Sequence, residues 1–220
     1  MIFADRTEAG IQLAEALSRF EGDDAVVLAI PRGGVVVAEP VARRLSAPLD
    51  VVVPRKVGAP GNPELGLGAV APGVRVLDER LIRDLGVTPD YLEQEIAAQE
   101  DEIARRLKVF RRGRLPVDVT GRTVIVVDDG VATGGTAVAA CRWARAHGAG
   151  RVVLAVPVAP RQAIPTLGEE VDELVVLATP DPFYAVGQWY RDFEQVSDEE
   201  VARILDQAAR GPDPDPGRGE

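Results

Sequence analysis

The sequence predicts an α/β fold, in which a mainly parallel sheet is flanked by helices and carries a small cap, or hood, and an inserted long helix. Short β-branched runs alternate with helical patterns through most of the 220 residues. These runs are continuously apolar, which is typical of parallel strands that are covered on both faces. One long helical pattern and one Gly/Pro-rich stretch interrupt the alternation and indicate the insertion.

The strands follow one another along the chain. The first, residues 25–30, runs into a glycine pair and a helical stretch that ends at Leu45. The strand at 123–127 runs into a small-residue loop and a helix at 137–146. Valine and isoleucine dominate these runs, which favours extended structure. Further strands are predicted at 50–53, 151–156 and 173–178.

Two segments break this alternation. Residues 58–68 are rich in Gly and Pro and predict a mobile loop, which is followed by a hairpin at 69–77 around Pro72 and Gly73. Residues 89–112 predict a long helix whose apolar side packs on the body of the protein or on a partner subunit. The residues on that side are Leu92, Ile96, Ile103, Leu107 and Phe110.

We expect residues 1–210 to form a single domain, followed by a disordered tail at 211–220 that is rich in Pro, Gly and Asp. Its core would comprise about residues 20–58 and 115–180, and its hood and insertion about 59–114 and 181–210. The single cysteine and single histidine exclude an internal disulfide and a zinc site of the usual Cys/His kind.

The charge balance limits which classes of partner the chain can bind. Lysine and arginine number 25 against 35 aspartates and glutamates, a net charge of −10. This balance disfavours binding to nucleic acid or to an anionic membrane, although a small basic pocket for a phosphorylated metabolite remains compatible with it. The chain shows neither a signal peptide nor an apolar stretch of roughly 18 residues, so we expect a cytoplasmic location.

Residues 124–136, with the sequence VIVVDDGVATGGT, are the most informative stretch. A strand runs into two acids, then into a small-residue loop, then into a helix. Ligands bind at the carboxyl ends of strands in open α/β sheets, and a glycine-rich helix start favours a phosphate. The two acids can accept hydrogen bonds from vicinal hydroxyls, so the stretch predicts a site for a ribose phosphate.

Other phosphate motifs fit this stretch less well. Gly135 precedes Thr136 where a nucleotide P-loop has lysine, and the glycine spacing is not that of a dinucleotide fingerprint. A helix that is merely capped after an acidic turn stays the structural alternative.

At this stretch the sequence resembles the type I phosphoribosyltransferase family, whose signature these thirteen residues match. The resemblance implies that Asp128 and Asp129 contact the ribose 2- and 3-hydroxyls. It also implies that the following loop cradles the 5-phosphate. The residues of that loop are Ala132, Thr133, Gly134, Gly135 and Thr136.

Further stretches agree with the resemblance. Arg32, Gly33 and Gly34 follow the first strand, where the family has a diphosphate-binding loop, and Arg32 offers a fork of donors. Arg55 and Lys56 end the next strand and would contact the diphosphate. The Gly/Pro-rich loop falls where the family has a flexible lid that excludes water. Each stretch has a structural alternative. The first could be a tight turn that opens a helix, one of the two cations could be a solvated surface charge, and the loop could be a long disordered connection.

The acceptor site would lie in residues 183–193. There Tyr184 or Trp189 could stack on a base, as in purine-using members of the family, which carry a Val-Gly pair like Val186 and Gly187. The spacing after Gly187 departs from the purine pattern, and plain packing of a C-terminal cap is the alternative.

The resemblance implies transfer of a 5-phosphoribosyl group from 5-phosphoribosyl 1-diphosphate to a small nitrogenous base, with a purine preferred and diphosphate released. Asp128, Asp129, Arg32 and Lys56 are the catalytic candidates. The resemblance further implies Mg²⁺ as cofactor. The two acids would bind this ion indirectly, through substrate or water.

Two other function classes stay open. A regulatory protein could bind the donor as a signal without catalysis, although the acidic balance argues against a nucleic-acid face. An accessory domain could rely on a partner for the acceptor site. The helix at 89–112 could also supply a face for a homodimer.

Overall fold

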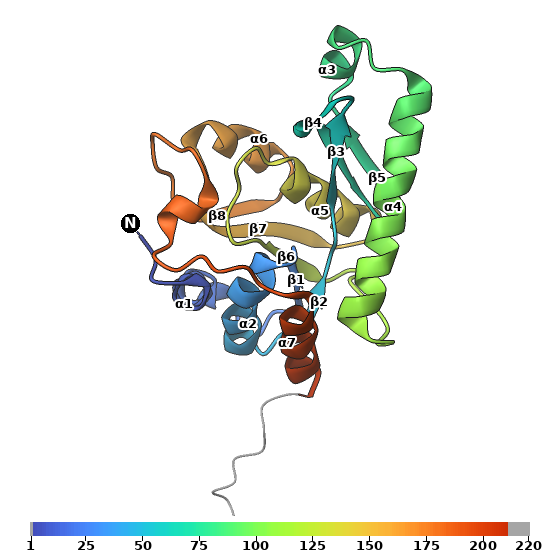
Figure 1. Ribbon diagram of the computed structural model, residues 1–220. Helices are drawn as coiled ribbons and strands as arrows, with labels where there is room; N and C mark the ends of the chain where they lie inside the picture. Colours follow the sequence, from blue (N-terminus) through green and yellow to red (C-terminus); the bar gives the residue numbers. More distant parts are fainter. Residues whose placement is uncertain (1, 211–220) are drawn as a thin grey trace, which may run out of the picture.

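The computed structural model describes residues 2–210, and its centre is a five-stranded sheet (Figure 1). The strand order is β2-β1-β6-β7-β8, and all neighbouring strands are parallel. The predicted fold class is therefore confirmed. The predicted tail at 211–220 lies outside the described residues. The strands are β1 (Ala25–Ala29), β2 (Leu49–Val51), β6 (Thr123–Val127), β7 (Arg151–Val158) and β8 (Glu173–Ala178).

Helices cover both faces of this sheet (Figure 1). Successive strand residues point to opposite faces, so Val27 of β1 joins one core cluster and Val26 joins the other. Every residue of β1 is buried, which explains its continuous apolar sequence. One face carries α1 (Arg6–Ala16), α2 (Gly33–Leu45) and α7 (Asp198–Arg210), and the other carries α5 (Gly135–Ala146) and α6 (Ile164–Glu169).

The predicted mobile loop at 58–68 is wrong, because these residues form strands of a second, antiparallel sheet. A Cβ placed on Gly68 would lie 2.1 Å from the carbonyl oxygen of Val76, so this glycine permits close approach of two strands. The predicted hairpin around Pro72 and Gly73 is confirmed. The strands of this sheet are β3 (Arg55–Ala59), β4 (Asn62–Ala71) and β5 (Val74–Leu77).

A short helix, α3 (Glu79–Asp84), leads to the long helix α4 (Pro89–Arg111), which runs beside the small sheet (Figure 1). Ile96, Ile103 and Phe110 of α4 are buried in the core shared with β3, β4 and α7. The predicted packing of this helix on the body is therefore confirmed.

Short 3-10 turns complete the chain at η1 (Ser18–Phe20), η2 (Arg161–Ala163) and η3 (Val186–Trp189). Among the helices of residues 2–210, none is long and apolar enough to cross a membrane.

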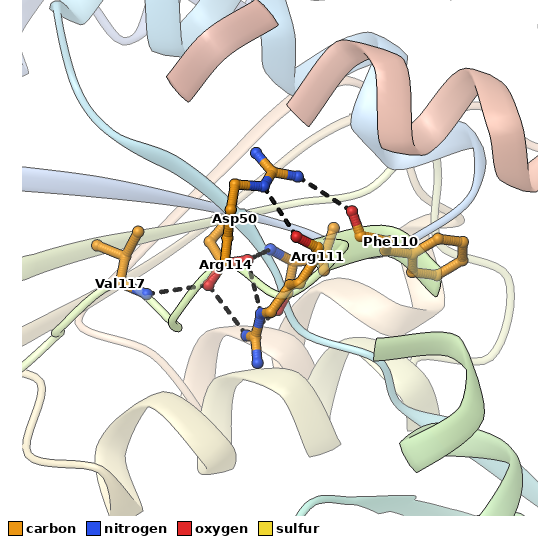
Figure 2. Close-up of polar contacts among 6 residues, drawn as sticks. Asp50, Phe110, Arg111, Arg114 and Val117 are labelled. Atoms are coloured by element: carbon orange, nitrogen blue, oxygen red, sulfur yellow. Dashed lines mark hydrogen bonds and ion pairs between the residues drawn. The ribbon is translucent and has the colours of Figure 1, made fainter. Parts of the chain in front are cut away.

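The buried carboxylate of Asp50 ties edge strand β2 to the end of α4 (Figure 2). It accepts hydrogen bonds of 3.1 and 3.0 Å from Nε and Nη2 of Arg111, and one of 3.0 Å from the backbone N–H of Val117. Arg114 closes the helix end by donating to the carbonyl oxygen of Phe110 at 3.0 Å. This network fixes where α4 ends against the sheet.

We predict that Asp50→Ala lowers the free energy of unfolding by about 3–5 kcal/mol, because it leaves the guanidinium of Arg111 buried without its partner. Urea denaturation measures the loss. Asp84→Ala is the control, since its 3.6 Å ion pair with Arg80 is exposed and should contribute less than about 1 kcal/mol. Equal losses in the two variants would contradict the anchoring role of Asp50.

Candidate active site

Loops from the carboxyl ends of β1, β2 and β6 meet at one cleft of about 410 Å³. Because β1 lies between β2 and β6, the segments that follow these three strands are neighbours. Residues of α1, α4 and the chain before α7 complete the wall. The lining residues are Arg6, Ile30, Pro31, Arg32, Gly33, Pro54, Arg55, Lys56, Arg106, Asp128, Asp129, Thr136, Phe193, Gln195 and Val196.

Many of the predicted site residues reach this cleft: Arg32, Gly33, Arg55, Lys56, Asp128, Asp129 and Thr136. Gly34 lies directly beneath it, against the backbone of Asp128. The other residues of the predicted phosphate loop, Ala132 to Gly135, join the acid pair to Thr136 without lining the cleft themselves.

The acid pair packs tightly against the turn that opens α2. A Cβ on Gly33 would lie 1.9 Å from Oδ2 of Asp129, and a Cβ on Gly34 would lie 2.9 Å from Cα of Asp128. Glycine is therefore required at both positions for the turn and the acids to touch. The first strand and the signature strand thus present their functional loops as one packed unit.

Burial raises the pKa of both carboxyls. The pKa of Asp128 lies well above its usual range, because the group is desolvated and because Asp129 is negatively charged beside it. Burial also raises the pKa of Asp129, although the guanidinium of Arg6 acts in the opposite direction. A cation or a hydroxyl donor that is brought beside the pair would stabilise its charged form.

Arg6 is a site residue that sequence reasoning missed. Its Nε donates to Oδ2 of Asp129 at 2.7 Å, and its Nη1 donates to the carbonyl oxygen of Glu194 at 2.8 Å. The guanidinium also lies over the ring of Phe193, 3.7 Å from the ring centre. Arg6 therefore joins α1, the signature acid and the C-terminal segment.

The opposite wall of the cleft is cationic. Arg55 donates through Nε to Oε1 of Gln99 at 2.9 Å, and Nζ of Lys56 lies 3.2 Å from Oε2 of Glu64. Arg106 of α4 is the second missed residue. Burial lowers the pKa of Arg55, and the charge of Arg106 lowers it further. This wall is suited to an anion.

Little in the sequence could have identified Arg6 and Arg106. Asp5, which caps α1 by accepting from the backbone N–H of Glu8 at 2.8 Å, gives a recognisable helix start. This signal shows where α1 begins, but it does not show that the side chain of Arg6 contacts Asp129. Arg106 lies among several charges of a long helix, and only the folded chain distinguishes the one that faces the cleft.

The predicted base-stacking aromatics lie away from the cleft. Tyr184 is 78% exposed, and the ring of Trp189 stacks on Phe183 with ring centres 6.2 Å apart. Phe193 and Gln195, which follow in the same segment, line the cleft instead. Tyr184 faces solvent, Trp189 packs against the cluster of Phe3, Ala9 and Tyr190, and sequence spacing alone does not distinguish them from Phe193.

The carboxylates fit a magnesium ion that arrives with a phosphorylated ligand. Within residues 2–210, no group of three or more His, Cys, Asp or Glu side chains could hold a metal by itself. Magnesium commonly binds through one or two carboxylates together with substrate phosphates and water. Asp128 and Asp129 offer such a pair at the edge of a cationic cleft.

We predict that Asp128→Asn stabilises the protein at neutral pH. The folded pKa of Asp128 is raised, so its favourable contribution is complete below the ordinary carboxyl pKa and is lost as pH rises through the raised value. The amide removes this loss, and it can still accept from the N–H of Asp129. The expected gain in unfolding free energy is about 1–2 kcal/mol at pH 7 and shrinks towards about pH 4.

Thermal denaturation at both pH values measures this effect, with Asp84→Asn as the exposed control. A destabilised Asp128→Asn protein at pH 7, or a gain that does not change with pH, would contradict the assignment of the raised pKa to Asp128.

Known proteins are similar to this chain in sequence, and a solved structure is similar to it in fold. Residues 5–175 match the phosphoribosyl transferase domain family. Two Mycobacterium tuberculosis proteins, from strains CDC 1551 and H37Rv, are provisionally named phosphoribosyl transferases and are 50% identical over 210 residues, or 95% of this chain. The chain spans about half the length of these curated relatives, 47% of each.

A solved structure is also similar over nearly the whole chain. The protein TT1426 from Thermus thermophilus is 49% identical, with a TM-score of 0.80 over 93% of this chain and 98% of that one. The family match runs from α1 into β8 and so includes the glycine turn, the cationic wall and the signature acids. The chain therefore belongs to the phosphoribosyl transferase domain family.

Proposed function

We propose that this chain transfers the 5-phosphoribosyl group of 5-phosphoribosyl 1-diphosphate to a small nitrogenous base and releases diphosphate. The observation that carries the proposal is the shared cleft of the signature acids and the cationic wall. Five cationic side chains line it against two carboxylates, Asp128 and Asp129. Such an excess favours a ligand with several negative charges, and the proposed donor carries both a phosphate and a diphosphate.

The parts of the donor have distinct places in this proposal. The ribose hydroxyls would donate to Asp128 and Asp129. The 5-phosphate would lie at the loop 132–136, where the start of α5 presents free backbone N–H groups. The diphosphate would lie between the turn at Arg32 and the wall that carries Arg55 and Lys56.

The reaction needs positioning and charge stabilisation rather than a protein nucleophile. The bond between ribose C1 and the diphosphate oxygen breaks, and its electron pair leaves with diphosphate. A nitrogen of the base bonds to C1 and releases its proton to water. Arg32 and Lys56 would stabilise the leaving charge, while Asp128 and Asp129 hold the ribose. Mg²⁺, when bound, would neutralise part of the diphosphate charge.

The acceptor would enter from the side of the C-terminal segment. Val186 packs against the signature loop, since a Cβ on Gly130 would lie 2.5 Å from its Cγ1. Phe193 and Gln195 then reach the cleft with an aromatic face and an amide. A purine, with its flat ring and polar edge, suits these groups and stays our preferred acceptor.

One observation favours a second function, in which the chain binds the donor without catalysis, as a regulator or as an accessory domain. Tyr184 and Trp189 lie away from the cleft, so the acceptor side offers fewer contacts than the donor side.

We predict micromolar binding of 5-phosphoribosyl 1-diphosphate in the presence of Mg²⁺, and loss of this binding in the Asp128→Ala/Asp129→Ala double variant, which lacks the ribose ligands. Isothermal titration measures both, and Asp84→Ala should bind like the native chain. Release of diphosphate on addition of purines would identify an enzyme. Binding of the donor without release of diphosphate for any base tried would favour the regulatory or accessory function. If the folded native chain does not bind the donor, the proposed function is wrong.

A further inference from the structure

We infer that Arg106 of α4 and Arg55 of β3 form a pair of guanidinium groups that binds the leaving diphosphate, so that α4 contributes directly to the site. The inference rests on the proposed function and adds to it a binding residue outside the signature, on a helix to which the sequence assigns only packing. Both side chains line the cleft that contains Arg32 and the acid pair.

The sheet order places this pair on the side where the leaving group belongs. β2 is the edge strand, next to β1, and the chain passes from β2 directly into β3 at Arg55. The acceptor segment lies towards Arg6 and the acid pair, because Phe193 contacts Arg6 and the hydroxyl of Tyr190 donates to the carbonyl oxygen of Asp129. A donor whose ribose is held at Asp129 therefore has two cationic parts of the cleft beside its diphosphate. These are the turn at Arg32, whose Nη1 lies 3.7 Å from Oδ1 of Asp198, and the Arg55–Arg106 wall.

Both guanidinium groups are held through Nε only. Nε of Arg55 donates to Gln99, and Nε of Arg106 donates to Oε1 of Glu102 at 2.7 Å. Within residues 2–210, no protein group accepts a hydrogen bond from their Nη atoms. Each side chain is thus fixed in direction while its terminal donors stay available, which is the arrangement that binds phosphate oxygens in pairs.

The charges around this pair also favour an anion. Burial lowers the pKa of Arg55 and the positive charge of Arg106 lowers it further, while the carboxylates of Glu102 and Glu95 act in the opposite direction. Glu102 offsets part of this charge, and hydrogen bonds from Arg105 and Arg106 lower its pKa to about 2. Glu102 therefore stays ionised and holds Arg106 in place, and a diphosphate between the two guanidinium groups would relieve their repulsion.

The helix that presents Arg106 is fixed near both ends. Near its start, the hydroxyl of Tyr91 donates to the carbonyl oxygen of Gly58 at 3.1 Å. At its end, Arg111 bonds the buried Asp50. These contacts hold α4 against the small sheet and the edge strand, so the wall is built before any ligand arrives.

Arg105 supplies a matched control for the test. It shares the partner Glu102 with Arg106, at 2.7 Å in both cases, but 55% of its side chain is exposed and it does not line the cleft. The side chain of Arg106 is 20% exposed. Arg105→Ala and Arg106→Ala thus remove the same charge from neighbouring positions of one helix.

The experiment is isothermal titration of the native chain and both variants with inorganic diphosphate, 5-phosphoribosyl 1-diphosphate and ribose 5-phosphate, each with Mg²⁺. We expect Arg106→Ala to weaken binding of diphosphate and of the donor by at least about tenfold, and to leave ribose 5-phosphate within about twofold of the native value. Arg105→Ala should change none of these. Arg106→Lys, which keeps the charge but loses the fork, should recover part of the loss.

The outcomes separate this inference from the proposed function. If the native chain binds the donor and Arg106→Ala or Arg106→Gln binds diphosphate equally well, the inference is wrong and the proposed function stands. Equal weakening by Arg105→Ala would also overturn it, because general charge would then explain the effect. If the native chain binds neither donor nor diphosphate, both the inference and the proposed function are wrong.

Discussion

The contact on which the site depends is the one between the turn at Gly33 and Gly34 and the acid pair Asp128–Asp129. It brings the loop after β1 so close to the loop after β6 that no other residue fits at either glycine. The contact buries two carboxyls and raises their pKa values. Burial of the charged groups costs free energy of folding, which the surrounding apolar core must offset. Arg6 counters part of it through its ion pair with Asp129. Stability and function oppose one another here, as is common where a site is built before its ligand binds.

The insertion between β2 and β6 supplies the cationic wall of the cleft. The five-stranded sheet supplies the glycine turn and the acids, whereas the small sheet and α4 supply the cations that face them. The buried pair of Asp50 and Arg111 joins these two parts, because it links the edge strand β2 to the end of α4. An interaction remote from the ligand thus sets the position of the cationic wall. A second cavity has its charged groups engaged by the protein itself, since Arg43 pairs with Glu39, Arg111 pairs with Asp50, and Arg114 donates to the carbonyl oxygen of Phe110.

The elements that follow from local patterns are those that the sequence predicts well. Buried parallel strands such as β1 and β6 are apolar throughout, and the signature loop combines acids, glycines and threonines in an unusual order. Residues 58–68 form strands rather than the predicted mobile loop, because Gly68 permits the close approach of β5, which local sequence does not show. Arg6 acquires its role through a contact with Asp129, which is 123 residues away in sequence, and Arg106 acquires its role by lining a cleft that other segments of the chain complete. Phe193 lines this cleft, whereas Tyr184 of the same segment is exposed, and only the folded chain shows the difference.

A crystal structure of the protein with 5-phosphoribosyl 1-diphosphate and Mg²⁺ would locate each part of the donor directly. We expect the ribose hydroxyls on Asp128 and Asp129, the 5-phosphate at the loop 132–136, and the diphosphate between the turn at Arg32 and the wall of Arg55 and Arg106. A donor seated elsewhere, for example in the cavity beside Asp50 and Arg111, would contradict this expectation. So would a donor in the cleft with its diphosphate directed away from α4.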